Sequence, residues 1–359
     1  MVPHVYRILA HWNCSKILGF QDICAAAPFC YALAMLMALL LGLAVAGADR
    51  TAADHMYEHG QYQDAAGQYS KLVNANPNDA SLLIRLGDCQ QQIGQFPAAE
   101  RSFRGALERA PDSLPAWVGL TEAFLSEGRP RDAMQSASRA LRLNSNDRDA
   151  RRAMAHVLAA TNQFLQAEGM FRELTGSDPK DARSWFLLGE LMYRGGYYHA
   201  AQQSLEKSLA LQPANVRARI YRAVCLVKTG SLQEGEAQCK RLIDDPTTPK
   251  DLDLWLTYVE LLYDSQRTSE ALRMANQVIG FAPDHPIARY WLAKCMLQSG
   301  KLADASAEAE RAVAAAPQLP FARTLLLQIY RKQGRTADAA RQADWLREYE
   351  DRRARRDIK

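Results

Sequence analysis

Apolar and small residues recur along this chain with helical spacing, in paired segments separated by polar turns. In residues 80–113, a first stripe of Leu83, Leu86 and Gly87 is followed by a second stripe, which consists of Phe96, Ala99, Phe103 and Ala106. Gly94 between the stripes permits a tight turn, and Pro111 ends the second helix because proline cannot continue its hydrogen bonds. The pattern predicts a helical hairpin, which cannot bury its own apolar stripes and must stack on neighbours.

The hairpin pattern repeats at an interval of 34 residues, with two extra residues near the middle of the chain. The small residue in the second helix marks the register, at Ala65, Ala99, Ala133, Ala167, Ala201, Ala271, Ala305 and Ala339. Nine units can be counted, starting near residues 46, 80, 114, 148, 182, 216, 252, 286 and 320. Gly235 replaces the alanine in the sixth unit, the extra residues fall in 244–249, and Asn162 replaces the turn glycine of the fourth unit.

This pattern resembles the tetratricopeptide repeat (TPR) family, over about residues 46–353. The resemblance implies an all-α fold: a right-handed superhelical solenoid of helix-turn-helix repeats, with about eight to nine repeats in residues 49–353. It also implies that the first helix of each pair lines a concave groove, which in the family holds a peptide or a partner's helix. We therefore expect one elongated array in which each repeat contacts its neighbours.

The resemblance further implies that positions 2, 5, 9, 12 and 13 of each repeat face the groove. The acids there are Asp88, Glu122, Glu190 and Glu260, the bases are Arg152, Arg183, Arg194, Arg217 and Lys228, and the aromatic residues are Phe186, Tyr193, Tyr290 and Phe321. Aromatic residues beside arginine are typical of binding hot spots. The predicted protein-binding residues are Arg183, Phe186, Glu190, Tyr193 and Arg194 of the fifth repeat, with Arg152, Glu122 and Tyr290 from other repeats. The alternative is that these are solvated groove residues with no ligand.

Some family members hold a carboxylate terminus with an asparagine at position 9 and nearby lysines. Position 9 of this chain carries no asparagine: its residues are Asp88, Glu122, His156, Glu190, Val224, Glu260, Lys294 and Gln328. A carboxylate clamp of the chaperone-binding type is therefore disfavoured.

The leader, residues 1–48, contains an uncharged apolar run at 23–48 that is long enough to span a bilayer. The run ends in small residues, Ala44-Val45-Ala46-Gly47-Ala48, which a signal peptidase accepts. The segment predicts either a cleaved signal peptide or a single hydrophobic transmembrane helix that anchors the chain. The slight bias of Lys and Arg favours placing the repeats on the non-cytoplasmic side, so that the protein is membrane-anchored, secreted or periplasmic.

The cysteines of the array occupy apolar repeat positions. Cys89, Cys225 and Cys295 share the tenth position of their repeats, and Cys239 aligns with Phe103. We expect these four to be free, buried thiols rather than disulfides, because equivalent core sites in different repeats lie too far apart to bridge.

Nothing in the sequence predicts catalysis, a cofactor or a metal. His55 and His59 stand four residues apart without a convincing third ligand, and no phosphate-binding loop or nucleophile motif is present. We therefore expect no enzyme activity.

Charge adds little to this picture. With 44 Lys and Arg against 40 Asp and Glu, the net charge of +4 gives no electrostatic case for nucleic acid. The basic tail at 354–359 is interpreted as the polar end of the last helix, and the alternative is a tail that serves nucleic acid, anionic lipid or nuclear import.

These features predict an exported or membrane-anchored adaptor or scaffold that binds partner proteins or peptides in its groove. The alternatives are a structural component of an envelope assembly, including a homo-oligomer, and a targeting or regulatory subunit of a separate enzyme such as a glycosyl transferase.

Overall fold

The computed structural model describes residues 50–357, which contain helices and turns but no β-strand. The apolar run at 23–48, predicted to be a signal peptide or an anchor, lies outside the described residues, as do residues 358 and 359. No helix among the described residues has the length and apolar character needed to cross a membrane.

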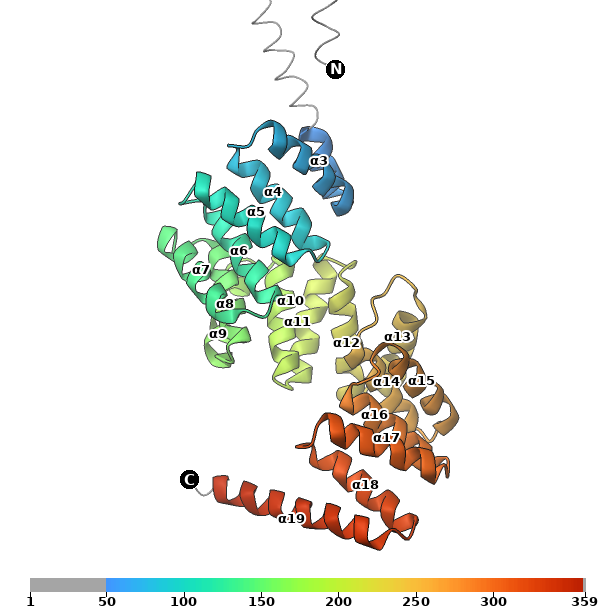
Figure 1. The fold of residues 1–359 in the computed structure, drawn as a ribbon. Coiled ribbons are helices and arrows are strands. Elements are labelled where there is room, and N and C mark those ends of the chain that lie inside the picture. The colour runs from blue at the N-terminus through green and yellow to red at the C-terminus, as the bar shows by residue number, and fades with distance from the viewer. Residues whose placement is uncertain (1–49, 358–359) are drawn as a thin grey trace, which may run out of the picture. The chain divides into compact units, whose positions relative to one another are not determined.

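The chain divides into two compact units between Ala150 and Arg151, where the sequence led us to expect one continuous array. In the first unit, residues 50–58 are helical and precede a series of paired helices (Figure 1): α3 (Tyr62–Ala75), α4 (Ala80–Gln92), α5 (Phe96–Arg109), α6 (Leu114–Ser126) and α7 (Pro130–Leu143). Helix α8 (Arg148–Ala160) begins just before the division.

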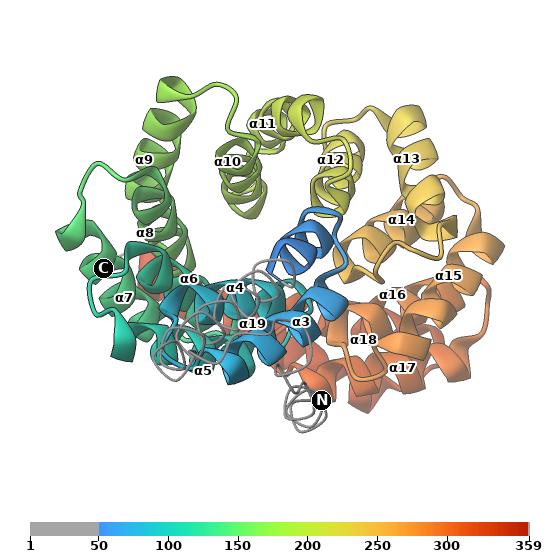
Figure 2. The same cartoon turned by 90° about the horizontal axis from the view of Figure 1, so that it is seen from above.

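The second unit continues the same alternation of helices. Its elements are α9 (Phe164–Ser177), α10 (Ala182–Arg194), α11 (Tyr198–Leu211), α12 (Val216–Lys228), α13 (Leu232–Asp244), α14 (Leu252–Asp264), α15 (Thr268–Phe281), α16 (Pro286–Gln298), α17 (Leu302–Ala315), α18 (Pro320–Lys332) and α19 (Thr336–Asp357). Helix α19 crosses the boundary expected at residue 353 and continues to Asp357. Within this unit, the first helices α10, α12 and α14 lie on the inner side of a curved row, and the second helices α11, α13 and α15 lie on its outer side (Figure 2).

The predicted repeat starts are confirmed from the second repeat onward. The first helices begin at Ala80, Leu114, Arg148, Ala182, Val216, Leu252, Pro286 and Pro320. Several of these starts are fixed by side-chain caps: Asp79, for example, accepts a hydrogen bond from the backbone N–H of Ser81 at 2.8 Å. Such a cap satisfies an N–H group that the helix itself leaves unpaired.

The turn inside each hairpin needs a left-handed backbone conformation. Gly94, with φ of +75°, follows α4, and its N–H donates to the carbonyl of Gln91. The equivalent glycines in the described residues share this conformation, and Asn162 and Gln266 adopt φ of +60° where the fourth and seventh repeats lack glycine. Glycine adopts this region without the steric penalty that a Cβ atom brings.

Each hairpin packs its large apolar side chains against small residues of the neighbouring helices. Phe103 is completely buried, and its ring lies against Gly87 of α4 and Gly119 of α6. A Cβ atom added at either glycine would approach the ring to 2.8 Å or less. Two successive first helices therefore share one aromatic side chain of the second helix between them.

Candidate functional site

Three first helices of the second unit bring aromatic and charged side chains together on their inner side. The tyrosine cluster, as we define it, consists of Phe186, Glu190 and Tyr193 of α10, Arg217 and Tyr221 of α12, and Asp253 of α14. The rings of Tyr193 and Tyr221 stack with centroids 4.8 Å apart and an interplanar angle of 22°. Phe186 lies nearly parallel to Tyr221, with a centroid separation of 6.2 Å.

Helical spacing explains why α10 supplies three members. Phe186, Glu190 and Tyr193 stand four and then three residues apart, which places them on one helix face. The opposite side of the helix is fixed in the core by Leu188 and Met192, which are both buried, as the sequence predicted. The cluster therefore rests on a packed helix.

Polar contacts join the rings into one network. The Arg217 guanidinium donates to the Glu190 carboxylate and to the Tyr221 hydroxyl oxygen, both at 2.9 Å. The Tyr221 hydroxyl in turn donates to Glu190 at 3.2 Å. The Tyr193 hydroxyl donates to the Asp253 carboxylate at 3.2 Å, which links α10 to α14.

The surroundings of the two tyrosines keep their hydroxyls protonated. Burial raises the pKa of Tyr193, and the charge of Asp253 and its hydrogen bond raise that pKa further. Burial and the neighbouring Glu190 also raise the pKa of Tyr221. The Asp251 carboxyl at the start of α14 has a raised pKa as well, because it is buried and close to Asp253, although the backbone N–H of Leu254 and the charge of Arg217 oppose the shift. Two carboxyl groups, Glu190 and Asp251, thus interact with the charge of Arg217.

The members of the cluster differ in exposure. Phe186 is only 8% exposed, with the Arg217 guanidinium 5.6 Å from its ring centroid. Tyr193 and Tyr221 are half-buried, and Arg217 and Asp253 are exposed. The accessible part of the cluster therefore consists of the two half-buried tyrosines and the charged groups beside them.

A second set of rings lies farther along the same row of first helices. The α16 aromatic group, as we define it, consists of Tyr263, Tyr290, Trp291, Lys294 and Phe321. The ammonium of Lys294 lies 4.4 Å from the ring centroids of both Tyr263 and Trp291, which is cation–π distance. Phe321, which is 38% exposed, meets Tyr290 edge-on at 4.9 Å. An ion pair of 2.6 Å joins Lys228 of α12 to Glu260 of α14, and α14 is the helix that contributes residues to both sets.

The predicted binding residues do not form one site in the structure, because they lie on α6, α8, α10 and α16. Phe186, Glu190 and Tyr193 are brought together in the tyrosine cluster, and Arg183 and Arg194 are exposed on the same helix. Tyr290 belongs to the α16 aromatic group instead. Glu122 is a half-buried residue of α6 in the first unit.

Two of the predicted binding residues are buried rather than open to the groove. Arg152, expected to be a groove base, is 7% exposed, and its guanidinium binds Asp181 at 2.7 Å and Ser184 at 3.1 Å. It is a structural ion pair between consecutive repeats. Phe186, expected to offer aromatic surface to the groove, is only 8% exposed, with Tyr221 stacked beside its ring and the Arg217 guanidinium 5.6 Å from its centroid.

Sequence reasoning missed Tyr221 and Asp253 as members of the cluster. Tyr221 stands at the sixth position of its repeat, which the inward-facing set does not include. The signal that could have found it is its spacing of four residues from Arg217, which places both side chains on one helix face. Trp291 of the α16 aromatic group occupies the same repeat position.

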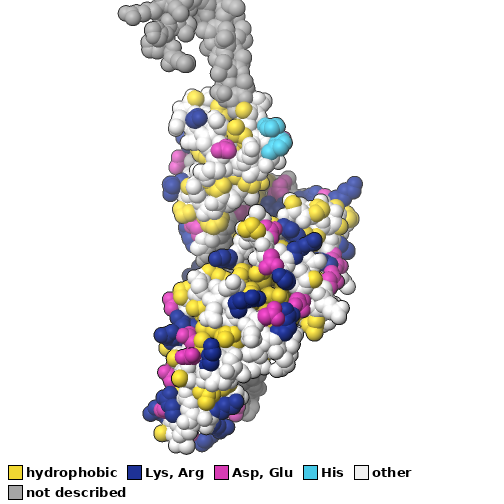
Figure 3. Space-filling model, turned by 90° about the vertical axis from the view of Figure 1, so that its right-hand side faces the viewer, with side chains coloured by type: hydrophobic (Ala, Val, Ile, Leu, Met, Phe, Trp, Pro, Cys, Tyr) yellow, Lys and Arg dark blue, Asp and Glu magenta, His cyan; other side chains and the backbone are white. Residues whose placement is uncertain are grey.

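The charges on the surface are mixed in sign. On the face that Figure 3 shows, basic and acidic side chains are interspersed with apolar ones, and neither sign forms a continuous patch. The face shown therefore presents no extended electrostatic field of a single sign.

Known proteins share both the sequence pattern and the fold. A family model described as "Anaphase-promoting complex, cyclosome, subunit 3" matches residues 160–242. DnaJ homolog subfamily C member 3 of Homo sapiens is 26% identical over 183 residues, which are 47% of this chain and 36% of that protein. The cellulose synthase operon protein C of Pseudomonas fluorescens is 25% identical over 202 residues, which are 54% of this chain and 15% of that protein. The matches thus span about a third or less of these relatives.

The solved structure of the APC/C hetero-tetramer Cut9-Hcn1 has the same fold. Its TM-score is 0.67 at 14% sequence identity, over 77% of this chain and 54% of that chain. The family model of the tetratricopeptide repeat matches residues 56–123, 124–191 and 262–329, more than half of the chain. With the repeated helical hairpins described above, this match shows that the chain belongs to the tetratricopeptide repeat family.

Proposed function

We propose that the protein is a non-enzymatic interaction scaffold whose second unit binds a segment of a partner protein along α10, α12 and α14. The observation that carries this proposal is the tyrosine cluster: two stacked, half-buried tyrosines held on a packed helix row beside exposed charged groups. Tyrosine and arginine dominate binding hot spots because they contribute large contact area together with hydrogen bonds. Repeat arrays present extended surfaces of this kind.

The charges of the cluster favour a particular kind of segment. Asp251 and Asp253 lie at the start of α14, Glu190 lies across from them, and Arg217 is the one basic member of the cluster. An excess of carboxyl groups beside ring faces suits a lysine or arginine side chain, which can pair with a carboxylate and lie over a ring. We therefore infer a segment with a basic residue next to an apolar one.

A second candidate is a targeting subunit for a separate enzyme such as a glycosyl transferase. The similarity to cellulose synthase operon protein C favours this candidate, because the name of that relative places it in an operon with a cellulose synthase, which is a glycosyl transferase. The match covers only 15% of that protein, so the general scaffold ranks first.

Site-specific crosslinking tests the proposed surface directly. A photoreactive phenylalanine analogue placed at Tyr193 of the full chain is expected to capture a protein partner in the native cells, whereas the same analogue at Tyr197 is the matched control. Tyr197 is 59% exposed and lies in the turn before α11, outside the cluster. Equal capture from both positions, or none from Tyr193, argues against the tyrosine cluster as the site.

The captured partner then permits a binding measurement. The double substitution Tyr193→Ala and Tyr221→Ala is expected to weaken binding by about 2 kcal/mol or more, as for other aromatic anchors. Tyr197→Ala should leave affinity nearly unchanged, and circular dichroism should show that all variants keep their helix content.

We further propose that the leader delivers the repeats to the non-cytoplasmic side of a membrane. Support comes from the uncharged run at 23–48 and the small residues that end it. A reporter that is active only outside the cytoplasm, fused after Lys359, should be active. Deletion of residues 23–48 should abolish that activity, and an unchanged signal would refute export. N-terminal sequencing of the mature chain then separates cleavage near Ala48 from a retained anchor.

A further inference from the structure

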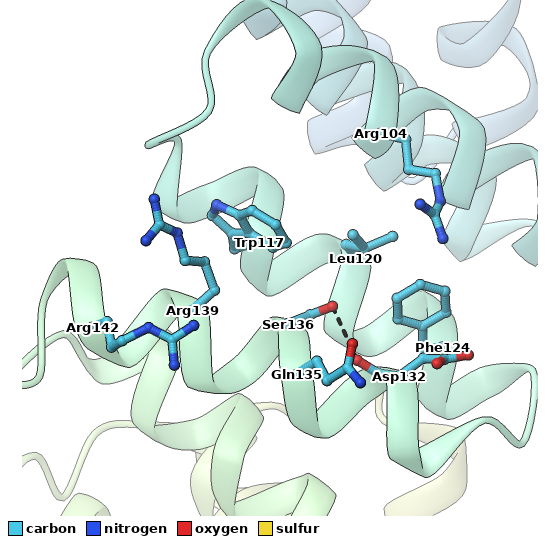
Figure 4. A pocket seen from close by; sticks show the side chains of 9 residues that line it. All are labelled: Arg104, Trp117, Leu120, Phe124, Asp132, Gln135, Ser136, Arg139 and Arg142. Atoms are coloured by element: carbon cyan, nitrogen blue, oxygen red, sulfur yellow. Dashed lines mark hydrogen bonds between the residues drawn. The ribbon is translucent and has the colours of Figure 1, made fainter.

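The first unit contains a pocket that the proposed function does not use. Its walls come from the second helices α5 and α7 and from the first helix α6 (Figure 4). The pocket has a volume of about 370 Å³. Its lining combines apolar and basic side chains: Arg104, Trp117, Leu120, Phe124, Asp132, Gln135, Ser136, Arg139 and Arg142. The tyrosine cluster belongs to other helices, in the second unit.

The apolar part of the pocket comes from one helix face. Trp117, Leu120 and Phe124 stand three and four residues apart on α6. The indole N–H of Trp117 donates to the carbonyl of Pro111 at 2.8 Å, so its polar atom is satisfied and the ring contributes apolar surface. Trp117 is half-buried, and Leu120 and Phe124 are only 3% exposed. Trp117, Leu120 and Phe124 therefore form an apolar strip along the pocket that is held in place by packing.

The charged part of the pocket is basic. Arg139 and Arg142 project from α7 at one end and Arg104 from α5 at the other (Figure 4). The acidic group of the lining, Asp132, already pairs with Arg129 at 2.7 Å. The lining thus carries an excess of positive charge on both sides of the strip.

Two of these arginines have partners that a ligand can replace. Arg104 pairs with Glu100 at 2.8 Å and Arg139 with Asp112 at 3.0 Å, and both guanidiniums are more than 40% exposed. The Arg139–Asp112 pair is exposed on both sides and contributes little to stability, so its carboxylate can be exchanged at little cost. Glu100 is only 16% exposed and also pairs with Arg129 at 2.8 Å, so it keeps an arginine partner when Arg104 turns to a ligand. Arg142 is exposed, and the described residues supply no ion-pair partner for it.

From this geometry we propose that the α5–α7 pocket is a second docking site, which binds an acidic peptide segment of another protein. One apolar side chain of the segment enters against Trp117 and Leu120. Its flanking aspartates or glutamates pair with Arg139 and Arg142 on one side and with Arg104 on the other. Charge complementarity selects this partner, because arginine forks pair with carboxylates at both ends of an apolar strip. The proposal is independent of the tyrosine cluster.

A labelled peptide tests the proposal on the full chain, kept in mild detergent. The probe is a short peptide of glutamates around a central leucine, and its binding is followed by fluorescence anisotropy. The double substitution Arg139→Glu and Arg142→Glu is expected to weaken binding by about tenfold or more. The matched control is Arg101→Glu with Arg131→Glu, which makes the same charge change at exposed positions of α5 and α7 that do not line the pocket.

Each outcome decides the proposal. The proposal is supported if Arg139→Glu with Arg142→Glu weakens probe binding while the control double variant binds like the parent. It is also supported if binding is lost when glutamine replaces the glutamates of the probe. An equal loss in both double variants shows a nonspecific charge effect and overturns it. Failure of the parent chain to bind, or tighter binding of a single-stranded oligonucleotide through the same arginines, overturns it as well.

A conservative variant controls for folding. Arg139→Gln with Arg142→Gln removes the charges without introducing new ones, and both positions are on the outer part of α7 rather than in the core. It should also weaken probe binding while the thermal unfolding midpoint stays close to that of the parent. Tyr193→Ala with Tyr221→Ala should not affect the probe, which separates this site from the proposed function.

Discussion

The guanidinium of Arg152 lies 2.7 Å from the carboxylate of Asp181, and both side chains are less than 10% exposed. Asp181 also caps α10, because its carboxylate accepts hydrogen bonds from the backbone N–H groups of Arg183 and Ser184, both at 3.1 Å. One carboxylate therefore starts the first helix of the fifth repeat and holds it to the first helix of the fourth. Buried ion pairs of this type are strongly destabilised when one partner is removed.

This pair predicts a loss of stability in acid. Burial alone would raise the pKa of Asp181, but hydrogen bonds from Ser184 and Arg152, together with the charge of Arg152, lower it to about 2. The folded-state pKa is thus below the unfolded value of about 4, so the stabilisation is complete above the unfolded pKa and is lost as the pH falls toward the folded one. We expect Asp181 to contribute about 2 kcal/mol near neutral pH, which disappears between about pH 5 and pH 2.

Urea unfolding of the parent and of Asp181→Asn over this pH range measures the effect. The two stability curves should differ at pH 7 and converge in acid. Asp112→Asn, which alters an ion pair whose carboxylate is 75% exposed, is the control and should follow the parent. Parallel curves for parent and Asp181→Asn would contradict the assignment.

The helices could be predicted from sequence because their signals are local. The start of α4 at Ala80, for example, follows from an N-cap at Asp79, an apolar stripe with helical spacing and a glycine after the helix. Most hairpins repeat several of these features, so one template located the later first helices to the residue.

The site could be predicted only in part, because its contacts join different repeats. Phe186 and Tyr193 were found from their own helix, but the stacking of Tyr221 between them depends on how α12 packs against α10. Arg152 stands at a repeat position that the resemblance assigned to the groove, but its guanidinium pairs with Asp181, the residue that caps the next first helix. The identity of a neighbouring side chain, which periodicity does not encode, decides such cases.

Gln266 offers a test of the turn requirement. It adopts φ of +60° where other repeats place glycine, and a side chain in this conformation costs about 1 kcal/mol. Gln266→Gly should therefore raise stability by about 0.5–1 kcal/mol, although glycine also loosens the unfolded chain. Gln203→Gly, an exposed position inside α11, is the control and should lower stability by about 1 kcal/mol. Differential scanning calorimetry would show the opposite shifts, and a lower midpoint for Gln266→Gly would refute the strain.

The thiols of the array should react slowly while the protein is folded. Cys89, Cys225, Cys239 and Cys295 are free and completely buried, as the sequence predicted. Burial raises the pKa of Cys89, Cys225 and Cys239 to about 12 and that of Cys295 to about 11, so the reactive thiolate is scarce at neutral pH. Peptide mapping after iodoacetamide treatment should find these four sites labelled only in denaturant, without prior reduction. Fast labelling of the native protein would show that the repeats open readily.

The contact between Gly119 and Phe103 predicts coupled mutational effects. A Cβ atom at residue 119 would lie 2.4 Å from the Phe103 ring, and that ring is completely buried and also lies against Gly87. Gly119→Ala should therefore destabilise the protein by about 1–3 kcal/mol through overpacking. Phe103→Leu alone should also destabilise it, because the smaller side chain leaves a cavity.

In the double variant the new methyl group occupies space that the ring has vacated. The combined loss should then be smaller than the sum of the two single losses by about 0.5 kcal/mol or more. Gly105→Ala on α5 is the control, since its Cβ would meet its neighbours at an ordinary distance of 3.5 Å. That substitution should be neutral or stabilising, because alanine favours a helix over glycine. Strict additivity of Gly119→Ala and Phe103→Leu in urea unfolding would mean that the ring and the glycine do not set the spacing of α4, α5 and α6.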